Sequence, residues 1–121
     1  MMKVWSPQEL ECITRRFDPL PKHIGGPGGE GTRAAILGDL IYLCGGSEER
    51  DDVWHYSDSC WTASIYGGGW TKSADMTTPR ASHTLTTVGN LLLATGGWNH
   101  APVLQYSVEI YSPAGVETYE L

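Results

Sequence analysis

Basic residues are scarce in this chain. Its 121 residues hold eight Lys and Arg against fourteen Asp and Glu, which gives a formal net charge of −6. Nucleic-acid binding needs a basic face that neutralises phosphates, and none is apparent in the sequence, so nucleic acid is not expected as a partner. Part of the acidic charge gathers at residues 48–52, and such a run is typical of a solvent-exposed loop tip.

Long apolar runs are missing too. No stretch approaches the roughly 18 apolar residues that a membrane span requires. Residues 1–7 do not resemble a signal peptide, because no apolar run of the needed length follows Lys3. We therefore expect a soluble protein of the cytoplasm with no membrane contact.

Cysteine is present only three times, at Cys12, Cys44 and Cys60, and these cannot all pair within one chain. None forms a C-x-x-C motif, which would indicate a zinc or redox site. The sequence therefore predicts buried or unreactive thiols in a reducing compartment.

Catalytic motifs are absent as well. The four histidines show none of the i, i+2 or i, i+4 spacings of metal-binding pairs, and neither H-E-x-x-H nor G-x-S-x-G occurs. The Gly-rich residues 25–31 are not followed by Lys-Ser/Thr, so they do not predict a phosphate-binding loop. We expect no catalytic residue, no metal and no cofactor, and hence a protein that is not an enzyme.

Turn-forming residues dominate what is present. With fifteen Gly, seven Pro and 10% aromatic residues, the composition favours a turn-rich β protein. Residues 34–44 predict two strands joined by a tight turn at Gly38-Asp39. Residues 82–95 predict the same hairpin around Gly89-Asn90.

Further strands follow each hairpin. After the first, residues 53–56 alternate as a third strand, residues 57–65 are ambiguous, and residues 70–74 predict a fourth strand. After the second, residues 108–111 predict the third strand and residues 116–121 the fourth.

The N-terminal residues allow two interpretations. Ser6-Pro7-Gln8-Glu9 has the form of a capping box, which would start a short helix. However, residues 5–13 align without gaps on residues 111–119, sharing an aromatic residue, Ser-Pro, and an apolar residue followed by Glu. Because a repeat match outranks a local cap signal, residues 10–17 are predicted to be a strand.

The repeat has a defined period. Gly45-Gly46 and Gly96-Gly97 are 51 residues apart, as are the two turn glycines. A period near 50 residues with four short strands per unit is typical of β-propeller blades. The predicted fold class is therefore all-β, made of four-stranded antiparallel blades in an incomplete propeller.

These residues resemble the kelch-repeat family, of the kelch-like type. The resemblance rests on both Gly-Gly doublets, on residues 108–113 (Val-Glu-Ile-Tyr-Ser-Pro) and more loosely on residues 53–56, and on Trp70 six residues before Met76. Residues 76–83 resemble the linker between blades. Two departures stand out: the third-to-fourth connection of the first repeat is long, and the last repeat has Thr118 and Tyr119 where a Trp is usual.

The resemblance implies a domain organisation. Residues 1–32 would hold the end of a preceding blade and a linker, residues 33–78 a first full blade, and residues 79–121 a second. Propellers contain four to eight blades, and a blade cannot bury both of its apolar faces alone. We therefore expect a fragment of a longer protein; the alternatives are self-association through the open blade faces and a different covering of those faces.

It also implies structural roles. Aromatic side chains would fill the space between blades, whereas Arg80 and His83 would hydrogen-bond backbone carbonyls at the corner between blades. The expected structural residues of the repeat are Gly45, Gly46, Tyr56, Trp70, Met76, Arg80, His83, Gly96, Gly97 and Tyr111.

The function that the resemblance implies is protein binding. Trp98, Asn99 and His100 follow the second doublet in a loop, and they are candidate partner-binding residues together with Trp54, unless their rings pack between blades. The partner would be a protein, in a ubiquitin ligase adaptor or a cytoskeletal complex. The alternative is part of a kelch-propeller enzyme, a copper oxidase or a sugar isomerase.

Overall fold

The regular structure of the chain is entirely β within the residues that the computed structural model describes, which are 2–6, 11–20, 30–99, 103–104, 107–112 and 115–120. No helix in these ranges has the length and hydrophobicity needed to cross a membrane. The strands are β1 Met2–Ser6, β2 Glu11–Arg15, β3 Arg33–Leu37, β4 Leu40–Cys44, β5 Ser47–Arg50, β6 Val53–Tyr56, β7 Cys60–Ser64, β8 Thr71–Lys72, β9 Thr84–Val88, β10 Leu91–Thr95, β11 Trp98–Asn99, β12 Val103–Leu104, β13 Ser107–Ser112 and β14 Gly115–Glu120.

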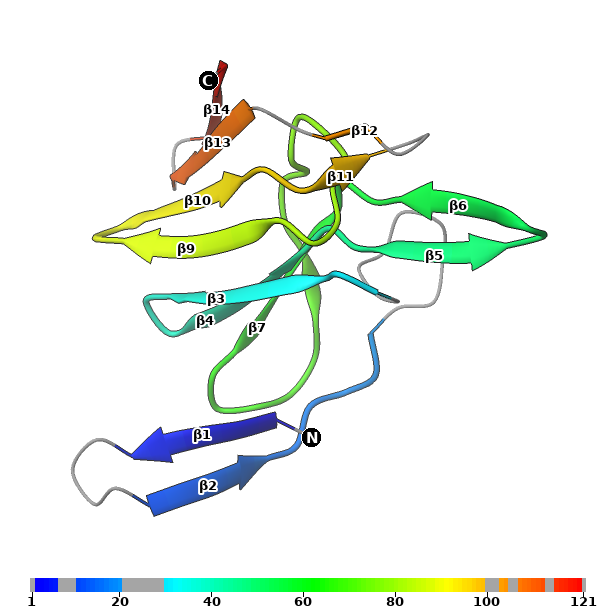
Figure 1. Cartoon of the computed structure of the whole chain (residues 1–121). Coiled ribbons are helices and arrows are strands. Elements are labelled where there is room, and N and C mark those ends of the chain that lie inside the picture. Colours follow the sequence, from blue (N-terminus) through cyan, green and yellow to red (C-terminus); the bar gives the residue numbers. More distant parts are fainter. Residues whose placement is uncertain are drawn as a thin grey trace.

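Two four-stranded antiparallel sheets form the body of the molecule (Figure 1). The first has the order β3-β4-β7-β8 and the second the order β9-β10-β13-β14. Their first strands lie side by side, and the Thr87 hydroxyl of β9 donates to the Ile36 carbonyl of β3. Each sheet is a meander of the kind that builds a propeller blade, so the predicted fold class is confirmed.

The repeat is visible in the backbone torsions. The predicted tight turns occupy Gly38 and Gly89, whose φ angles are 62° and 60°, a left-handed conformation that glycine adopts without steric cost. At another pair of equivalent positions, Gly31 has φ 74° and Ser82 has φ 55°. The 51-residue period is therefore a repeat of local conformation as well as of residue types.

Each sheet carries a small two-stranded hairpin between its second and third strands. In the first sheet β5 pairs with β6, and in the second β11 pairs with β12. The prediction that residues 53–56 form the third strand of the blade is therefore wrong, because this segment is the returning arm of the hairpin. The third strand is β7, which fills the stretch that the sequence left ambiguous.

The error came from the alternating pattern of Val-Trp-His-Tyr, which resembles Val-Glu-Ile-Tyr. In the two sheets Leu43 pairs with Trp61 and Ala94 with Glu109, so the true counterpart of residues 108–111 is residues 60–63. Trp61 thus occupies the register position of Glu109. Residues 48–52, expected as a loop tip, are instead the end of β5 and its turn.

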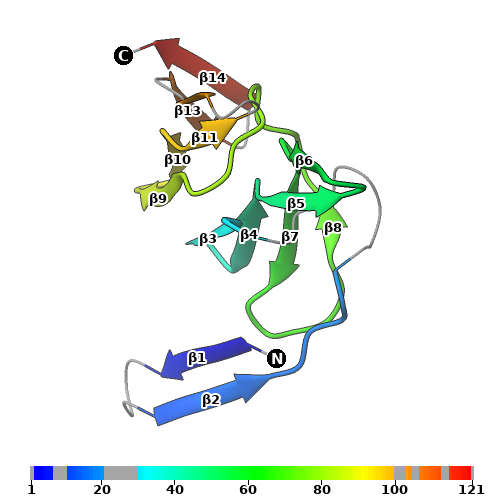
Figure 2. The same ribbon diagram turned by 45° about the vertical axis from the view of Figure 1, so that its right-hand side comes forward.

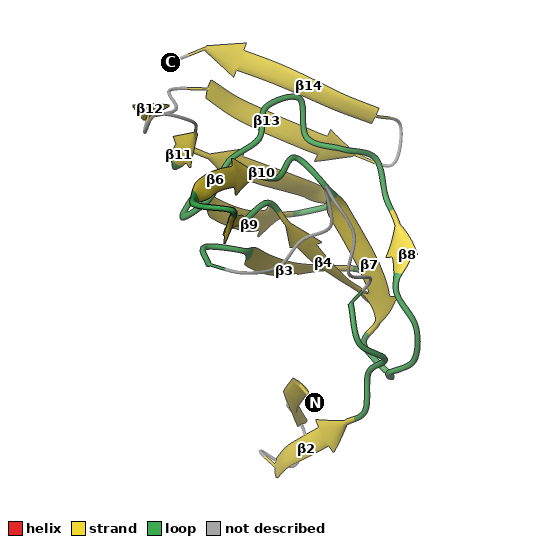
Figure 3. Ribbon diagram, turned by 90° about the vertical axis from the view of Figure 1, so that its right-hand side faces the viewer, coloured by secondary structure: helices red, strands yellow, loops and turns green. Residues whose placement is uncertain are grey.

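Strands β1 and β2 pair at the N-terminal end of the chain, apart from both sheets (Figure 2). The strand predicted within residues 10–17 is confirmed over β2. Residues 2–6 form the strand β1 and not a helix, and residues 7–10 lie outside the described residues. The segment after β2 runs along the outer side of the first sheet (Figure 3), where the ring of Phe17 lies 5.9 Å from that of Trp70. The Trp70 indole N–H donates to the Asp18 carbonyl at 2.8 Å.

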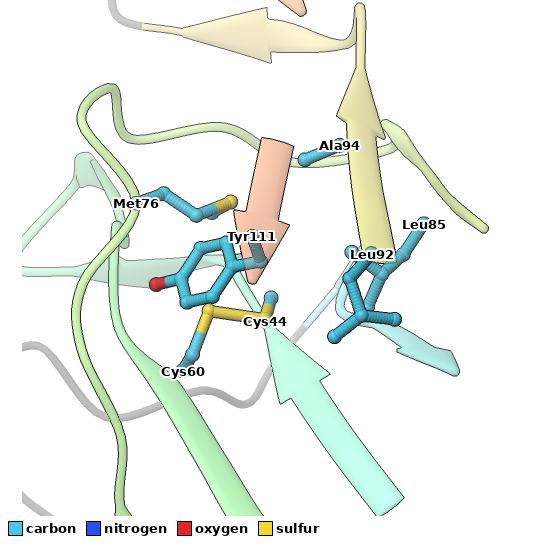
Figure 4. Packing of buried hydrophobic residues seen from close by; sticks show 7 residues of the cluster. All are labelled: Cys44, Cys60, Met76, Leu85, Leu92, Ala94 and Tyr111. Carbon is cyan, nitrogen blue, oxygen red and sulfur yellow. A yellow bond between two sulfur atoms is a disulfide. The ribbon is translucent and has the colours of Figure 1, made fainter. Parts of the chain in front are cut away.

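The core lies between the two blades (Figure 4). Cys44 and Cys60 come from the first sheet, and the ring of Tyr111 from the second sheet lies beside them. The two cysteines are fully buried, as expected, but they form a disulfide, so the prediction of thiols is wrong for this pair. The remaining members of the cluster are Met76, Leu85, Leu92 and Ala94.

Candidate interaction surface at the blade junction

The linker between the blades holds the bases of both hairpins. Gly46 N–H donates to the Arg80 carbonyl at 2.9 Å. One residue later, Ala81 and Trp98 exchange two backbone hydrogen bonds of 3.0 and 2.9 Å. Since β4 and β10 both end here, the β5–β6 and β11–β12 hairpins leave the two sheets at the same end (Figure 1). We call this end the hairpin face.

Trp54 and Trp98 are exposed aromatic residues of the hairpin face among those that the structure describes. Each residue keeps 44% of its accessible surface, Trp54 on β6 and Trp98 on β11. Trp54 lies opposite Glu49 in the hairpin register, and the adjacent Val53 is more exposed still. The rings are therefore not packed between blades.

The other predicted partner-binding residues differ from the tryptophans. Asn99 is half-buried, and its side-chain amide donates to the Pro79 carbonyl at 2.8 Å. This bond ties the end of β11 to the linker, so the structure gives Asn99 a supporting role. His100 lies outside the described residues.

Arg80 is the centre of the junction, and its side chain has no exposed surface. Its guanidinium donates to the Gly96 and Ser107 carbonyls at 3.1 Å each and to the Ser107 hydroxyl at 2.7 Å. It also pairs with the buried Glu109 carboxylate, with 2.8 Å between Nη2 and Oε2. Such a charge-assisted network joins the linker rigidly to β10 and β13.

Glu109 completes this network from the other side. Its carboxylate accepts hydrogen bonds from the backbone N–H groups of Thr77 and Thr78. A buried carboxylate is stable only when paired and hydrogen-bonded, and Glu109 has both kinds of partner. The sequence prediction missed Glu109, although the Val-Glu-x-Tyr motif pointed to its position.

His83 lies in the tightest part of the junction. It is 2% exposed, and neither ring nitrogen has a hydrogen-bond partner among the described residues. The expected bond from His83 to a backbone carbonyl is therefore not made. Burial lowers the pKa of His83 to about 4, and the charges of Arg80 and Arg33 add to this effect. The imidazole is thus neutral at pH 7.

The first Gly-Gly doublet is needed because of this crowding. A Cβ on Gly45 would lie 2.3 Å from the Arg80 carbonyl oxygen and 2.6 Å from Cε1 of His83. Gly97 of the second doublet similarly lies against the Ala81 carbonyl, 2.6 Å from where its Cβ would be. The doublets therefore let the linker approach both blades closely.

The remaining predicted structural residues lie in three different places. Met76 and Tyr111 are buried in the core, and the Tyr111 hydroxyl donates to the Ala74 carbonyl. Burial, reinforced by Glu109, raises the pKa of Tyr111. Trp70 is half-buried against Phe17 on the outer side, and Tyr56 is half-buried at the base of the β5–β6 hairpin, opposite Ser47. Neither of these two rings belongs to the core cluster between the blades.

The described residues contain no group of three His, Cys, Asp or Glu side chains placed to hold a metal ion. The residues that do converge at the junction are Arg80, Ser107 and Glu109, and they bond to one another and to the backbone. This arrangement positions the two hairpins.

Two comparisons with known proteins match this repeated sequence to kelch proteins. Residues 79–115 match the family model described as Kelch motif. The sequence is 33% identical to Kelch-like protein 36 from Bos taurus over an alignment 87 residues long, which covers 65% of this chain. The chain spans only 13% of the length of that relative. The resemblance predicted from the sequence is confirmed by both findings.

Proposed function

Because this chain is kelch-repeat sequence, we propose that it is a protein-binding module whose partner contacts the hairpin face through Trp54 and Trp98. The observation that carries the proposal is the pair of half-exposed indoles on two hairpins joined by one linker. Tryptophan is enriched at the energetic centres of protein interfaces. A rigid support lowers the cost of ordering such side chains on binding, and the Arg80 network provides that support.

The test compares partner capture by the wild-type chain and the double variant Trp54→Ala, Trp98→Ala. Tyr66→Ala is the matched control, because Tyr66 is a highly exposed aromatic residue beyond the far end of β7. Proteins that the wild type and the control capture, and the double variant does not, support the proposal. Equal capture by all three chains contradicts it.

Titration with a purified partner then gives the size of the change in affinity. We expect the double variant to raise Kd by about a hundredfold, since two tryptophan anchors each contribute about 1–2 kcal/mol or more. The identity of the captured protein distinguishes two possible contexts, recruitment of substrates to a ubiquitin ligase and attachment to the cytoskeleton. Both are proposals for the longer proteins in which kelch repeats occur.

A further inference from the structure

The Cys44–Cys60 disulfide joins the ends of β4 and β7 from which the β5–β6 hairpin extends. We call this pair of strand ends the neck of the hairpin. Cys44 is the last residue of β4, Cys60 is the first residue of β7, and the chain between them forms the β5–β6 hairpin. The two residues are paired in the strand register with 4.2 Å between their Cα atoms. Gly45 N–H donates to the Ser59 carbonyl beside them, which marks a non-hydrogen-bonded pair, where opposite side chains approach most closely.

The second blade has the same hairpin without this covalent closure. There Thr95 and Val108 hold the register positions of Cys44 and Cys60. The blade fold therefore does not require a disulfide at this point. The first hairpin has a closure that the second lacks, and it is the longer of the two.

Backbone hydrogen bonds tie the base of the first hairpin to the rest of the protein. Its base is held by backbone bonds from Gly46 to Arg80, from Arg80 to Ser57 and between Ser47 and Glu30. Beyond the base, residues 51–55 are all exposed, and Trp54 is among them. The position of Trp54 therefore depends on how firmly the neck is closed.

We propose that Cys44 and Cys60 form a reversible redox latch that holds the β5–β6 hairpin in its binding position. In the opening reaction a small dithiol attacks one sulfur and breaks the S–S bond, leaving a mixed disulfide and one cysteine thiolate. The second thiol of the reductant then displaces the other cysteine. Two electrons and two protons pass to the protein, and the dithiol becomes a cyclic disulfide.

The latch is also linked to the second blade. Both sulfurs are buried in the cluster that includes Met76 and the ring of Tyr111 (Figure 4). Attack by a dithiol therefore needs a local opening of the β4–β7 neck, so the latch responds slowly and keeps its state once set. Its effect on partner binding rests on the proposed function, whereas its effect on the hairpin does not.

The test measures amide hydrogen exchange of the whole chain equilibrated with oxidised or reduced dithiothreitol. Reduction should speed exchange in residues 47–56 about tenfold. The β11–β12 hairpin is the internal control and should change little. Unchanged exchange in residues 47–56, or an equal increase in both hairpins, would overturn the latch.

Two variants sharpen this result. The double variant Cys44→Thr, Cys60→Val carries the residue pair that the second blade has at these positions, so it should fold. Its amide exchange should match that of the reduced chain and should not change when dithiothreitol is added. Cys12→Ala should keep the full wild-type response. If the double variant exchanges like the oxidised chain, the disulfide does not hold the hairpin.

The last experiment measures the Kd of a partner whose capture depends on Trp54 and Trp98. We expect its Kd to be about tenfold higher for the reduced chain than for the oxidised chain. Equal Kd values would overturn the regulatory part of the proposal. If no tryptophan-dependent partner is captured, the proposed function fails, while the exchange measurement still decides whether the latch exists.

Discussion

Arg80 and Glu109 are 29 residues apart in sequence and form an ion pair in which both side chains are completely buried. Arg80 belongs to the linker between blades and Glu109 to the third strand of the second blade. The pair therefore fixes where the linker crosses that blade, and with it the bases of both hairpins.

Removing one partner should be costly. Glu109→Ala leaves the guanidinium buried without its counter-charge and removes the acceptor for Thr77 and Thr78, so we expect the free energy of unfolding to fall by about 3–5 kcal/mol. Urea titration measures the change. Lys72→Ala, which breaks the exposed pair with Asp75, is the control and should cost less than about 1 kcal/mol. Similar losses for both variants would contradict a junction held by the buried pair.

His83 should make the fold sensitive to acid. The pKa of His83 is about 6.5 in the unfolded chain and about 4 in the folded chain, so folding delays protonation of the imidazole as the pH falls. Between these values the unfolded state binds more protons, so stability is lost as pH falls. The pKa difference corresponds to about 3 kcal/mol at its limit.

The measurement is urea unfolding at several pH values between 7 and 4.5. His83→Leu cannot be protonated and should lose this part of the pH dependence, whatever its stability at pH 7. Parallel curves for His83→Leu and the wild type would show that His83 does not contribute.

Gly45 and Gly38 separate crowding from backbone strain. Both have positive φ, but a Cβ would meet the Arg80 carbonyl and the His83 ring only at Gly45. Gly38→Ala should cost about 1–2 kcal/mol for the left-handed conformation alone. Gly45→Ala should cost at least about 3 kcal/mol, because the linker or the blade must also move. Equal losses in thermal unfolding would contradict the close approach at Gly45.

The disulfide should stabilise the fold by an amount that its loop predicts. Its cysteines are 16 residues apart, and loops of this size are associated with about 3 kcal/mol of stabilisation. Cys44→Thr, Cys60→Val should therefore lower the free energy of unfolding by about 2–4 kcal/mol under oxidising conditions. With dithiothreitol present, wild type and variant should unfold within about 1 kcal/mol of each other. If the unfolding free energies still differ after reduction, the variant is destabilised by lost packing and not by the loss of the disulfide.

Trp98 should matter for binding and little for folding. Because the side chain is half-exposed, we expect Trp98→Ala to shift the unfolding free energy by less than about 1 kcal/mol. Leu92→Ala, at a fully buried core position, should cost about 2–5 kcal/mol in the same assay. A loss at Trp98 comparable with that at Leu92 would make Trp98 a core residue and remove it from the proposed surface.

Local signals predicted the repeated hairpins well. Gly38 and Gly89 have positive φ in the two turns, and glycine makes such turns recognisable from composition and spacing alone. The strand pairing that follows was harder. Residues 53–56 alternate and residues 57–65 are ambiguous in the sequence, and only pairing with β4 decides that residues 60–63 belong to the blade.

The junction illustrates the same limit. The position of Arg80 in the linker pointed to hydrogen bonds with carbonyls, but its pairing with Glu109 depends on a crossing that no local pattern encodes. The disulfide likewise follows from the register of β4 and β7, which places Cys44 opposite Cys60. Spacing along the chain carries no record of that register.

Trp61 occupies in the first blade the position that Glu109 occupies in the second, and the Lys72 ammonium lies 5.9 Å from the centre of its ring. One blade therefore buries an indole where the other buries an ion. Heating lowers the cost of keeping ions away from water, whereas the burial of apolar surface gains little further strength. At this one position, therefore, the desolvation cost of the Arg80–Glu109 pair falls on warming, and the burial of Trp61 has no matching term.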